Sequence, residues 1–474
     1  MKAAARSAGW GMVGHLAVPA STGLLVLGLP FLLDPQTYGY WQLYLFYALW
    51  LGYLTYGVPD GHHLRHAGQD LSTLDAGRFA GKFGYLIAGV AAAALVLAAV
   101  GAVVTTDETQ RLMWVLACAS TVLFVPRTLL TAALQSASRF GPFAAVVLSE
   151  RGLVVGLTLV AIALVGGDPG NLAVADLLAK GAGLLVGLVV LRRLLALERP
   201  DHTEAASDGT SAWAEVRADI GVGSVLVLAN LAAVSAHGVL RLAVERRWGI
   251  VEFGQVSLAF SAALLVTTAA HAMGWLALPR LARTPQEHFG RLHRLVRDGA
   301  RGPLAALVLL YLPVQAGLDL VLPDYRSALH YLALLLPLIV VESRWRVMTV
   351  GLLKVLRRQR VLLTINLVAL AVAVALGLLF TLLAPSTVAV VLSLLAVTVL
   401  RSTVTDIWLA HQLHGPWLEG VVLDLLVTGG LLAALSLGGL TGAAVGLAVV
   451  GVATWWHRQA TVELLTRVRQ EVVG

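Results

Sequence analysis

The stretch FGYLIAGVAAAALVLAAVGAVV, residues 83–104, decides the fold of this chain because it contains no charged side chain. A helix of this length rises 1.5 Å per residue and crosses the roughly 30 Å hydrocarbon core of a membrane. Similar apolar runs follow one another from end to end, separated by short turns. The sequence predicts fourteen membrane spans, at 9–33, 37–58, 83–104, 111–135, 142–166, 172–192, 219–243, 252–280, 301–323, 327–351, 361–383, 386–410, 418–437 and 439–456.

The composition is that of a protein with lipid as its solvent. Of the 474 residues, 58% are hydrophobic and 13% charged, whereas soluble domains carry about 25% charged residues. This excludes an ordinary cytoplasmic globule. The unbroken apolar runs exclude an outer-membrane barrel, whose strands alternate polar and apolar residues. Spans and turns use up the chain, so no segment is left for a soluble catalytic domain and we expect no enzyme.

The basic residues predict the topology. Of the 34 Lys and Arg residues, 23 fall at the termini or in the connections after even-numbered spans, and 4 fall in the opposite connections. Basic residues accumulate on the cytoplasmic side of membrane proteins. We therefore expect a multi-pass plasma-membrane protein with both termini in the cytoplasm. The basic excess is a topology signal and does not indicate a nucleic-acid partner.

The longest polar stretch between spans predicts the domain organisation. We expect an N-terminal six-helix lobe at 1–192, a cytoplasmic connecting loop at 193–217, a C-terminal six-helix lobe at 218–410, and two extra helices with a cytoplasmic tail at 411–474. The first apolar run is too long for a signal peptide, so we expect an uncleaved first helix. The single cysteine, Cys118, cannot form a disulfide within the chain.

The segment after the second predicted span, TYGVPDGHHLRHAGQDLSTLDAGRF (55–79), resembles a motif of bacterial polysaccharide flippases of the O-antigen and capsule type. In that family a G-x-x-D-G-x-x-L-R pattern, followed by glycines and a Leu-Asp pair, comes after the second helix. The matching positions here are Gly57, Asp60, Gly61, Leu64, Arg65, Gly68, Leu74 and Asp75.

Three further segments resemble the same family in the order in which the family has them. The junction of spans seven and eight is similar to its D-R and G-x-[YF]-S-x-A motifs, although Leu240 and Val256 depart from them. The outer turn 322–325 resembles the turn after the family's ninth helix. The matching positions are Arg241, Gly254, Ser257 and Ala259 at the junction, and Lys354, Arg357, Gln359, Arg360 and Asn366 after span ten.

The family belongs to the multidrug/oligosaccharidyl-lipid/polysaccharide exporter superfamily. The resemblance implies an all-α polytopic membrane protein of about 14 transmembrane helices, with two six-helix lobes around a central cavity plus two C-terminal helices. It implies a monomeric transporter that moves a lipid-linked oligosaccharide between the leaflets, in contact with membrane lipid and with no cofactor. The inner-loop motif residues that it carries over are Asp60, Gly61, Arg65, Asp75, Lys354 and Arg357.

A polyprenyl-diphosphate glycan needs a wet path with cationic partners, because its diphosphate is very costly to place in hydrocarbon. Arginine suits phosphate, since its guanidinium stays charged and bonds in a bidentate manner. Pairing of Arg127 with Glu150, or of Lys180 with Asp176, is the structural alternative. The candidates for substrate binding in the cavity are Arg127, Arg151, Arg241, Lys180 and Arg401.

Coupling to H⁺ or Na⁺ requires carboxylates or histidines within the spans. A hydrogen-bonded packing role is the alternative for each histidine. His62, His63 and His66 lack a convincing set of ligands, so we expect no metal site. The candidates for coupling or ion pairing are Glu150, Asp176, Asp319, His15, His237 and His271.

Several other functions stay open at this point. A multidrug cation antiporter of the same superfamily would bind cations through intramembrane carboxylates, whereas basic residues dominate the first half. A flippase for a peptidoglycan lipid precursor would share the fold. A membrane glycosyltransferase or polymerase would need a large outer loop, and the predicted outer loops are all short. A membrane scaffold that transports nothing is the remaining alternative.

Overall fold

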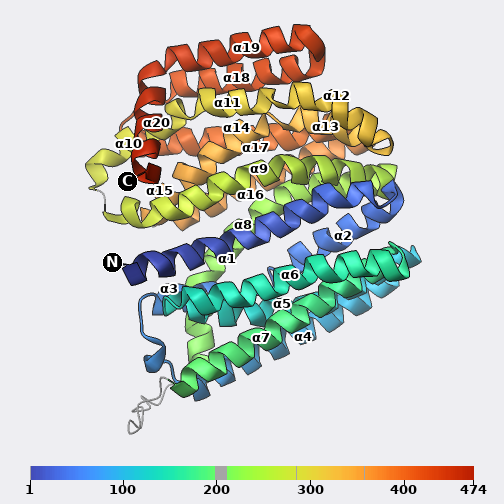
Figure 1. The fold of residues 1–474 in the computed structure, drawn as a ribbon, viewed down its shortest axis with the longest axis vertical. Coiled ribbons are helices and arrows are strands. Elements are labelled where there is room, and N and C mark those ends of the chain that lie inside the picture. Colours follow the sequence, from blue (N-terminus) through green and yellow to red (C-terminus); the bar gives the residue numbers. More distant parts are fainter. Residues whose placement is uncertain (1, 198–210, 284, 357, 474) are drawn as a thin grey trace. The chain divides into compact units, whose positions relative to one another are not determined.

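The computed structural model describes residues 2–197, 211–283, 285–356 and 358–473, and these residues form helices joined by short turns, with no strand among them (Figure 1). The chain forms two compact units, Met1–Val234 (unit 1) and Ser235–Gly474 (unit 2), whose boundary lies within helix α8. The connecting loop expected at 193–217 overlaps the ends of α7 and α8, and its middle lies outside the described residues. The expected lobes therefore stay a prediction.

Unit 1 is a bundle in which α5 packs against α2, α4, α6 and α7, and α1 packs against α6. Its apolar core joins α3, α4, α5, α6 and α7. The helices are α1 (Lys2–Gly28), η1 (Leu29–Phe31), α2 (Pro35–Leu51), α3 (Val58–His66), η2 (Leu71–Thr73), α4 (Ala76–Val104), α5 (Glu108–Ser136), α6 (Phe140–Val165), α7 (Pro169–Leu197) and the first part of α8 (Ala212–Trp248).

Unit 2 packs α9 against α13 and α14, α16 against α17, and α18 against α19. Its elements after α8 are α9 (Ile250–Arg283), η3 (Gln286–His288), α10 (Phe289–Gly299), α11 (Arg301–Leu309), α12 (Tyr311–Val321), η4 (Pro323–Tyr325), α13 (Arg326–Leu335), α14 (Leu338–Arg344), η5 (Trp345–Thr349), α15 (Val350–Val355), α16 (Gln359–Leu378), η6 (Leu379–Leu383), α17 (Thr387–Gln412), α18 (Leu418–Leu437), α19 (Gly439–Trp456) and α20 (Arg458–Val473).

Each of the fourteen predicted spans falls on one helix or on consecutive helices. Among the described residues, 11 helices are long and apolar enough to cross a membrane without interruption. The other three spans are the 17-residue α2 and two helices that proline interrupts. Pro313 cannot donate a hydrogen bond to the backbone of Leu309, where α11 ends, and Pro337 separates α13 from α14. The all-α polytopic fold is confirmed.

The outer surfaces of both units are apolar, as a lipid environment requires. Large aliphatic side chains on helix surfaces are exposed, among them Leu95, Val103 and Leu164 in unit 1 and Leu440 and Leu447 in unit 2. A soluble protein rarely exposes contiguous apolar patches of this extent. The polar side chains that are buried lie inside the bundles, and their contacts define the candidate site.

Candidate functional site

Three charged residues meet inside unit 1 and form what we call the unit 1 triad: Arg127 on α5, and Glu150 and Arg151 on α6. The Arg127 Nε atom lies 2.6 Å from Glu150 Oε2, and Arg151 Nη2 lies 2.9 Å from Glu150 Oε1. The side chains of Glu150 and Arg127 are 0% and 8% exposed, and that of Arg151 is 16% exposed. Glu150 therefore bridges two arginines, of which Arg151 is the more accessible.

The α7 helix makes room for this carboxylate. A Cβ atom at Gly183 would lie 2.8 Å from Glu150 Oε2, closer than real side chains pack. Glycine at this position therefore lets α6 and α7 approach with the carboxylate between them. The sequence pattern identified both charged residues of α6, but the glycine that accommodates them is on a different helix.

A second polar cluster lies next to the triad. Lys180 of α7 pairs with Asp176 one turn earlier, with 2.6 Å between Nζ and Oδ2. Tyr44 of α2 donates to the same carboxylate oxygen at 2.5 Å, and the Lys180 ammonium donates to the hydroxyl of Ser120 on α5 at 2.7 Å. The ring of Phe124 connects the two clusters, since Arg127 Cζ and Lys180 Nζ lie 5.1 and 5.8 Å from its centroid.

The charges of these two clusters do not cancel. Three cations (Arg127, Arg151 and Lys180) face two carboxylates (Glu150 and Asp176), which leaves one positive charge in excess. An uncompensated charge in a low-dielectric bundle is costly, so it is retained where it has a partner or a task. The arrangement suits an anion that approaches the more accessible guanidinium.

Arg401 of α17, one of the two candidates in the second half, pairs with Glu342 of α14 at 2.5 Å and lies over the Trp345 ring, with Cζ 4.1 Å from the centroid. Arg241 of α8 donates through Nη2 to the hydroxyl of Ser257 on α9 at 2.7 Å and lies between the rings of Phe253 and Phe260. The structure does not bring Arg241 and Arg401 into one cluster.

The candidate histidines have hydrogen-bonding or ring neighbours. His15 on α1 contacts the Phe143 ring, with 5.2 Å between centroids, and His237 on α8 lies 2.8 Å from Thr398 Oγ1. The side chains of His271, Asp319 and Lys354, and the whole of Arg357, lie outside the described residues. These candidates stay predictions.

Part of the inner-loop motif forms the short helix α3. Asp60, Gly61 and Arg65 lie inside this helix. Gly57, just before α3, and Gly68, just after it, have φ of 81° and 82°, where the lack of a Cβ removes the steric penalty. A Cβ at Gly61 would overlap the backbone of Asp219 on α8. The glycines of the motif thus allow α3 and α8 to pack backbone to backbone.

This close contact brings a buried carboxylate of α8 against two cations. Arg65 Nη1 lies 2.6 Å from Asp219 Oδ1, and Lys82 Nζ lies 2.7 Å from Oδ2. Lys82 also lies 3.0 Å from Glu215 Oε2. The side chains of Lys82 and Asp219 are 1% and 0% exposed. The sequence analysis did not single out Asp219, Glu215 or Lys82. The available signal was Asp219, a carboxylate at the start of an apolar run.

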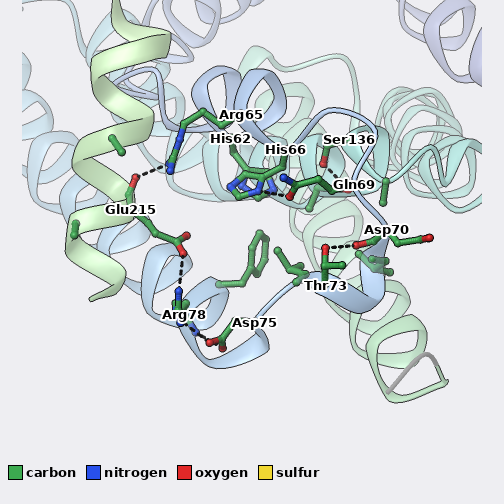
Figure 2. Close-up of a pocket in the computed structure, with 17 residues that line it drawn as sticks. His62, Arg65, His66, Gln69, Asp70, Thr73, Asp75, Arg78, Ser136 and Glu215 are labelled. Carbon is green, nitrogen blue, oxygen red and sulfur yellow. Dashed lines mark hydrogen bonds and ion pairs between the residues drawn. The ribbon is translucent and has the colours of Figure 1, made fainter. Parts of the chain in front are cut away.

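A cavity of about 400 Å³ opens beside this network, lined by residues of α3, η2, α4, α5 and α8 (Figure 2). Arg78 lines it and lies between two carboxylates, with its Nε atom 3.0 Å from Asp75 Oδ2 and its Nη1 atom 3.7 Å from Glu215 Oε1. Asp75 is itself the N-cap of α4 and accepts hydrogen bonds from Gly77 and Arg78.

His62 lines the same cavity and is buried. Burial, and then the Lys82 ammonium 3.2 Å from its Nδ1 atom, lower the pKa of His62 to about 2. The imidazole is therefore neutral throughout the physiological range. Among the described residues no group of three or more His, Cys, Asp or Glu side chains could hold a metal ion.

A third charged network lies inside unit 2. The side chains of Arg344 and Asp424 are 4% and 12% exposed. Arg344 makes two hydrogen bonds of 2.6 Å to the Asp424 carboxylate. Arg301, whose side chain is 0% exposed, lies 2.8 Å from Asp424 and 3.5 Å from Asp298. This network binds α18 to α11 and α14.

Solved structures resemble this chain. No protein-family model and no curated protein matches the sequence. The lipid II flippase MurJ, in an inward closed conformation, matches with a TM-score of 0.62 at 11% identity and covers 96% of this chain and 98% of its own. An inward-facing multidrug resistance MATE family transporter of the MOP superfamily matches with a TM-score of 0.60 at 14% identity, over 85% of this chain and 98% of its own.

A third similar structure is a MOP superfamily transporter from Pyrococcus furiosus, described as having a binding pocket of reverse polarity that suggests a different function. Its TM-score is 0.53 at 14% identity, over 85% of this chain and 95% of its own. Identities this low show the fold alone. The three proteins are transporters or flippases rather than enzymes, and the chain has the multi-pass helical fold of MOP superfamily transporters.

Proposed function

We propose that this protein is a transporter that moves a polyprenyl-diphosphate-linked oligosaccharide across the plasma membrane by alternating access, for the synthesis of a surface polysaccharide. The observation that carries the proposal is the one excess positive charge of the unit 1 triad and the neighbouring Lys180–Asp176 pair, with Arg151 as the most exposed of the cations. A diphosphate is the part of such a lipid that cannot enter hydrocarbon unaided. A guanidinium oriented by a buried carboxylate is a suitable partner for it.

The proposed roles differ between the two arginines. Arg151 contacts the diphosphate, and Arg127 adds positive charge while holding Glu150 in place. Lys180 and Asp176 extend the polar path toward Tyr44. Coupling to H⁺ or Na⁺ through the carboxylates is part of the proposal. Both termini are assigned to the cytoplasm, so a reporter fused after the last residue should give a cytoplasmic signal.

The same cluster argues against export of cationic drugs. A cation would have to approach two arginines and a lysine, and both carboxylates already have cationic partners within 2.9 Å. Like-charge repulsion in a medium of low dielectric is strong. The similarity to a multidrug transporter therefore supports the fold more than the cargo.

Reconstitution tests the proposal. Proteoliposomes containing the purified protein and a polyprenyl-diphosphate oligosaccharide in the inner leaflet are treated with a membrane-impermeant glycosidase, and the rate of glycan cleavage is measured. We expect cleavage to depend on the protein and to fall roughly tenfold to a hundredfold in Arg151→Gln, as when a hydrogen bond to a charged group is lost.

Arg111→Gln is the matched control, because Arg111 lies near the opposite end of α5 from the triad. Its rate should equal that of the wild type. Cleavage no faster than in protein-free liposomes, together with uptake of an organic cation such as ethidium, would reject the proposal in favour of a cation exporter.

A further inference from the structure

Unit 2 contains a charged cluster built like the unit 1 triad. Glu342 lies 2.7 Å from Arg346 Nε and 2.5 Å from Arg401 Nη2. We call these residues the unit 2 triad. Its carboxylate is 2% exposed, Arg401 is 4% exposed, and Arg346 is 28% exposed. As in unit 1, one buried carboxylate bridges a buried arginine and a more accessible one.

The two triads also share an aromatic contact. The buried arginine lies over a ring in each case: Arg127 over Phe124 at 5.1 Å, and Arg401 over Trp345 at 4.1 Å. A cation over an aromatic face is held in one orientation. The buried Arg401 Nε atom has no hydrogen-bond partner in the structure. The carboxylate and the ring thus fix the orientation of Arg401, and its Nε atom stays without a hydrogen bond.

The backbone at this position is unusual. Trp345 and Arg346 lie on the π-helical turn η5, which the Val350 amide closes by donating to the Trp345 carbonyl. Such turns occur mostly as single insertions in helices and are frequent at functional sites. The wider turn places Trp345 under Arg401 while Arg346 still reaches back to Glu342.

We propose that the unit 2 triad is a second anion-binding site, which takes an acidic group of the transported glycan. This inference rests on the proposed function, in which the unit 1 triad binds the diphosphate. If the unit 1 triad binds the diphosphate, a second anion site needs another anionic group on the same substrate. That group then lies on the oligosaccharide. A carboxylate on a sugar, as in a uronic acid, matches a guanidinium in a bidentate manner.

The expected substrate is therefore a lipid-linked oligosaccharide that carries an acidic sugar. The test compares two polyprenyl-diphosphate oligosaccharides that are identical except for one sugar, glucuronate or glucose, in the proteoliposome cleavage assay. We expect the wild type to transport the glucuronate form about tenfold faster at subsaturating concentration, as one charge-assisted hydrogen bond allows.

Variants separate the two sites. Arg346→Gln should reduce the acidic-to-neutral ratio to about one, Arg346→Lys should restore part of it, and Arg326→Gln, on the exposed start of α13, should keep it. Arg151→Gln should slow both lipids by the same factor. Equal rates for the two lipids in the wild type, or a ratio that Arg346→Gln leaves unchanged, would overturn the inference alone. Transport of neither lipid would overturn the proposed function itself.

Discussion

The triads and the network around Asp424 differ in how exposed their cations are. That network consists of two carboxylates and three arginines, each at most 12% exposed: Asp298, Asp424, Arg297, Arg301 and Arg344. In each triad, two arginines share one carboxylate, and one arginine is partly exposed. A network that is closed to its surroundings stabilises helix packing, whereas one with an accessible cation is suited to binding. The comparison separates structural from functional charges within the membrane.

The largest expected effect is on the closed network around Asp424. Asp424→Asn leaves Arg344 and Arg301 without their main counter-charge in a buried site, and breaking such a pair costs about 3–5 kcal/mol. Thermal unfolding in detergent should show a large drop in Tm. Glu419→Gln, an exposed change on the same helix, should cost less than about 1 kcal/mol. Equal Tm values for the two variants would contradict the assignment of a structural role.

The next effect concerns the glycine contact that closes the network around Asp219. Gly61→Ala places a methyl group against the α8 backbone, and overpacking of this kind costs about 1–3 kcal/mol. Gly84→Ala on α4 is the control, because a Cβ at Gly84 meets nothing within 4 Å. The Tm of Gly61→Ala should fall and that of Gly84→Ala should not. An unchanged Tm for Gly61→Ala would mean that the two helices do not pack this closely.

The pH dependence of stability tests the burial of His62. Its pKa is lowered to about 2 in the folded protein, from about 6.5 in the unfolded chain. Above pH 6.5 both states are neutral and the stability is unaffected. Below pH 6.5 the unfolded state binds a proton that the folded state does not, so stability falls as pH falls.

Between pH 7.5 and pH 5.0 this linkage removes about 2 kcal/mol, at 1.36 kcal/mol per unit below pH 6.5. The His62→Gln variant should lose that part of the decline in Tm. The exposed His288→Gln should keep it. A wild-type Tm that does not change over this range would contradict a buried neutral imidazole.

The smallest expected effect on stability is in the triads. A small effect there, beside the large one at Asp424, would support different roles for the two kinds of network. Arg151→Gln removes a partly exposed cation from a site with excess positive charge, so its unfolding free energy should change by less than about 1 kcal/mol. The same detergent unfolding measurement applies. A loss as large as that of Asp424→Asn would place the unit 1 triad among the structural networks.

The spans could be predicted from the sequence because apolar run length reports directly on membrane thickness. The helix α3 could not, since its polar VPDGHHLRH sequence carries none of that signal. The helix packs against α5 and, at Gly61, against α8, which is some 150 positions later in the chain. Helix interruptions at Pro313 and Pro337 follow from proline chemistry, but their positions within a span depend on packing.

The charged residues of the candidate site could be recognised as unusual, because charges are rare within spans. Their partners on other helices were harder to find. A helix that is apolar all round does not indicate which face meets its neighbour, so Glu342 and Arg401, 59 residues apart, gave no sign of contact. Two pairings named from the sequence were the exceptions. Lys180 and Asp176 have a spacing of four residues, which places them on one helix face, and Arg127 and Glu150 lie on consecutive predicted spans.

The central claim is that the unit 1 triad binds a diphosphate. Thermal unfolding of the purified protein with a polyprenyl diphosphate that carries no sugar, and with the corresponding polyprenyl alcohol, tests it most directly. A ligand that binds only the folded state raises its stability. We predict that the diphosphate raises the Tm of the wild type more than the alcohol does, and that Arg151→Gln abolishes the difference. Equal shifts from the two lipids in the wild type would contradict the claim.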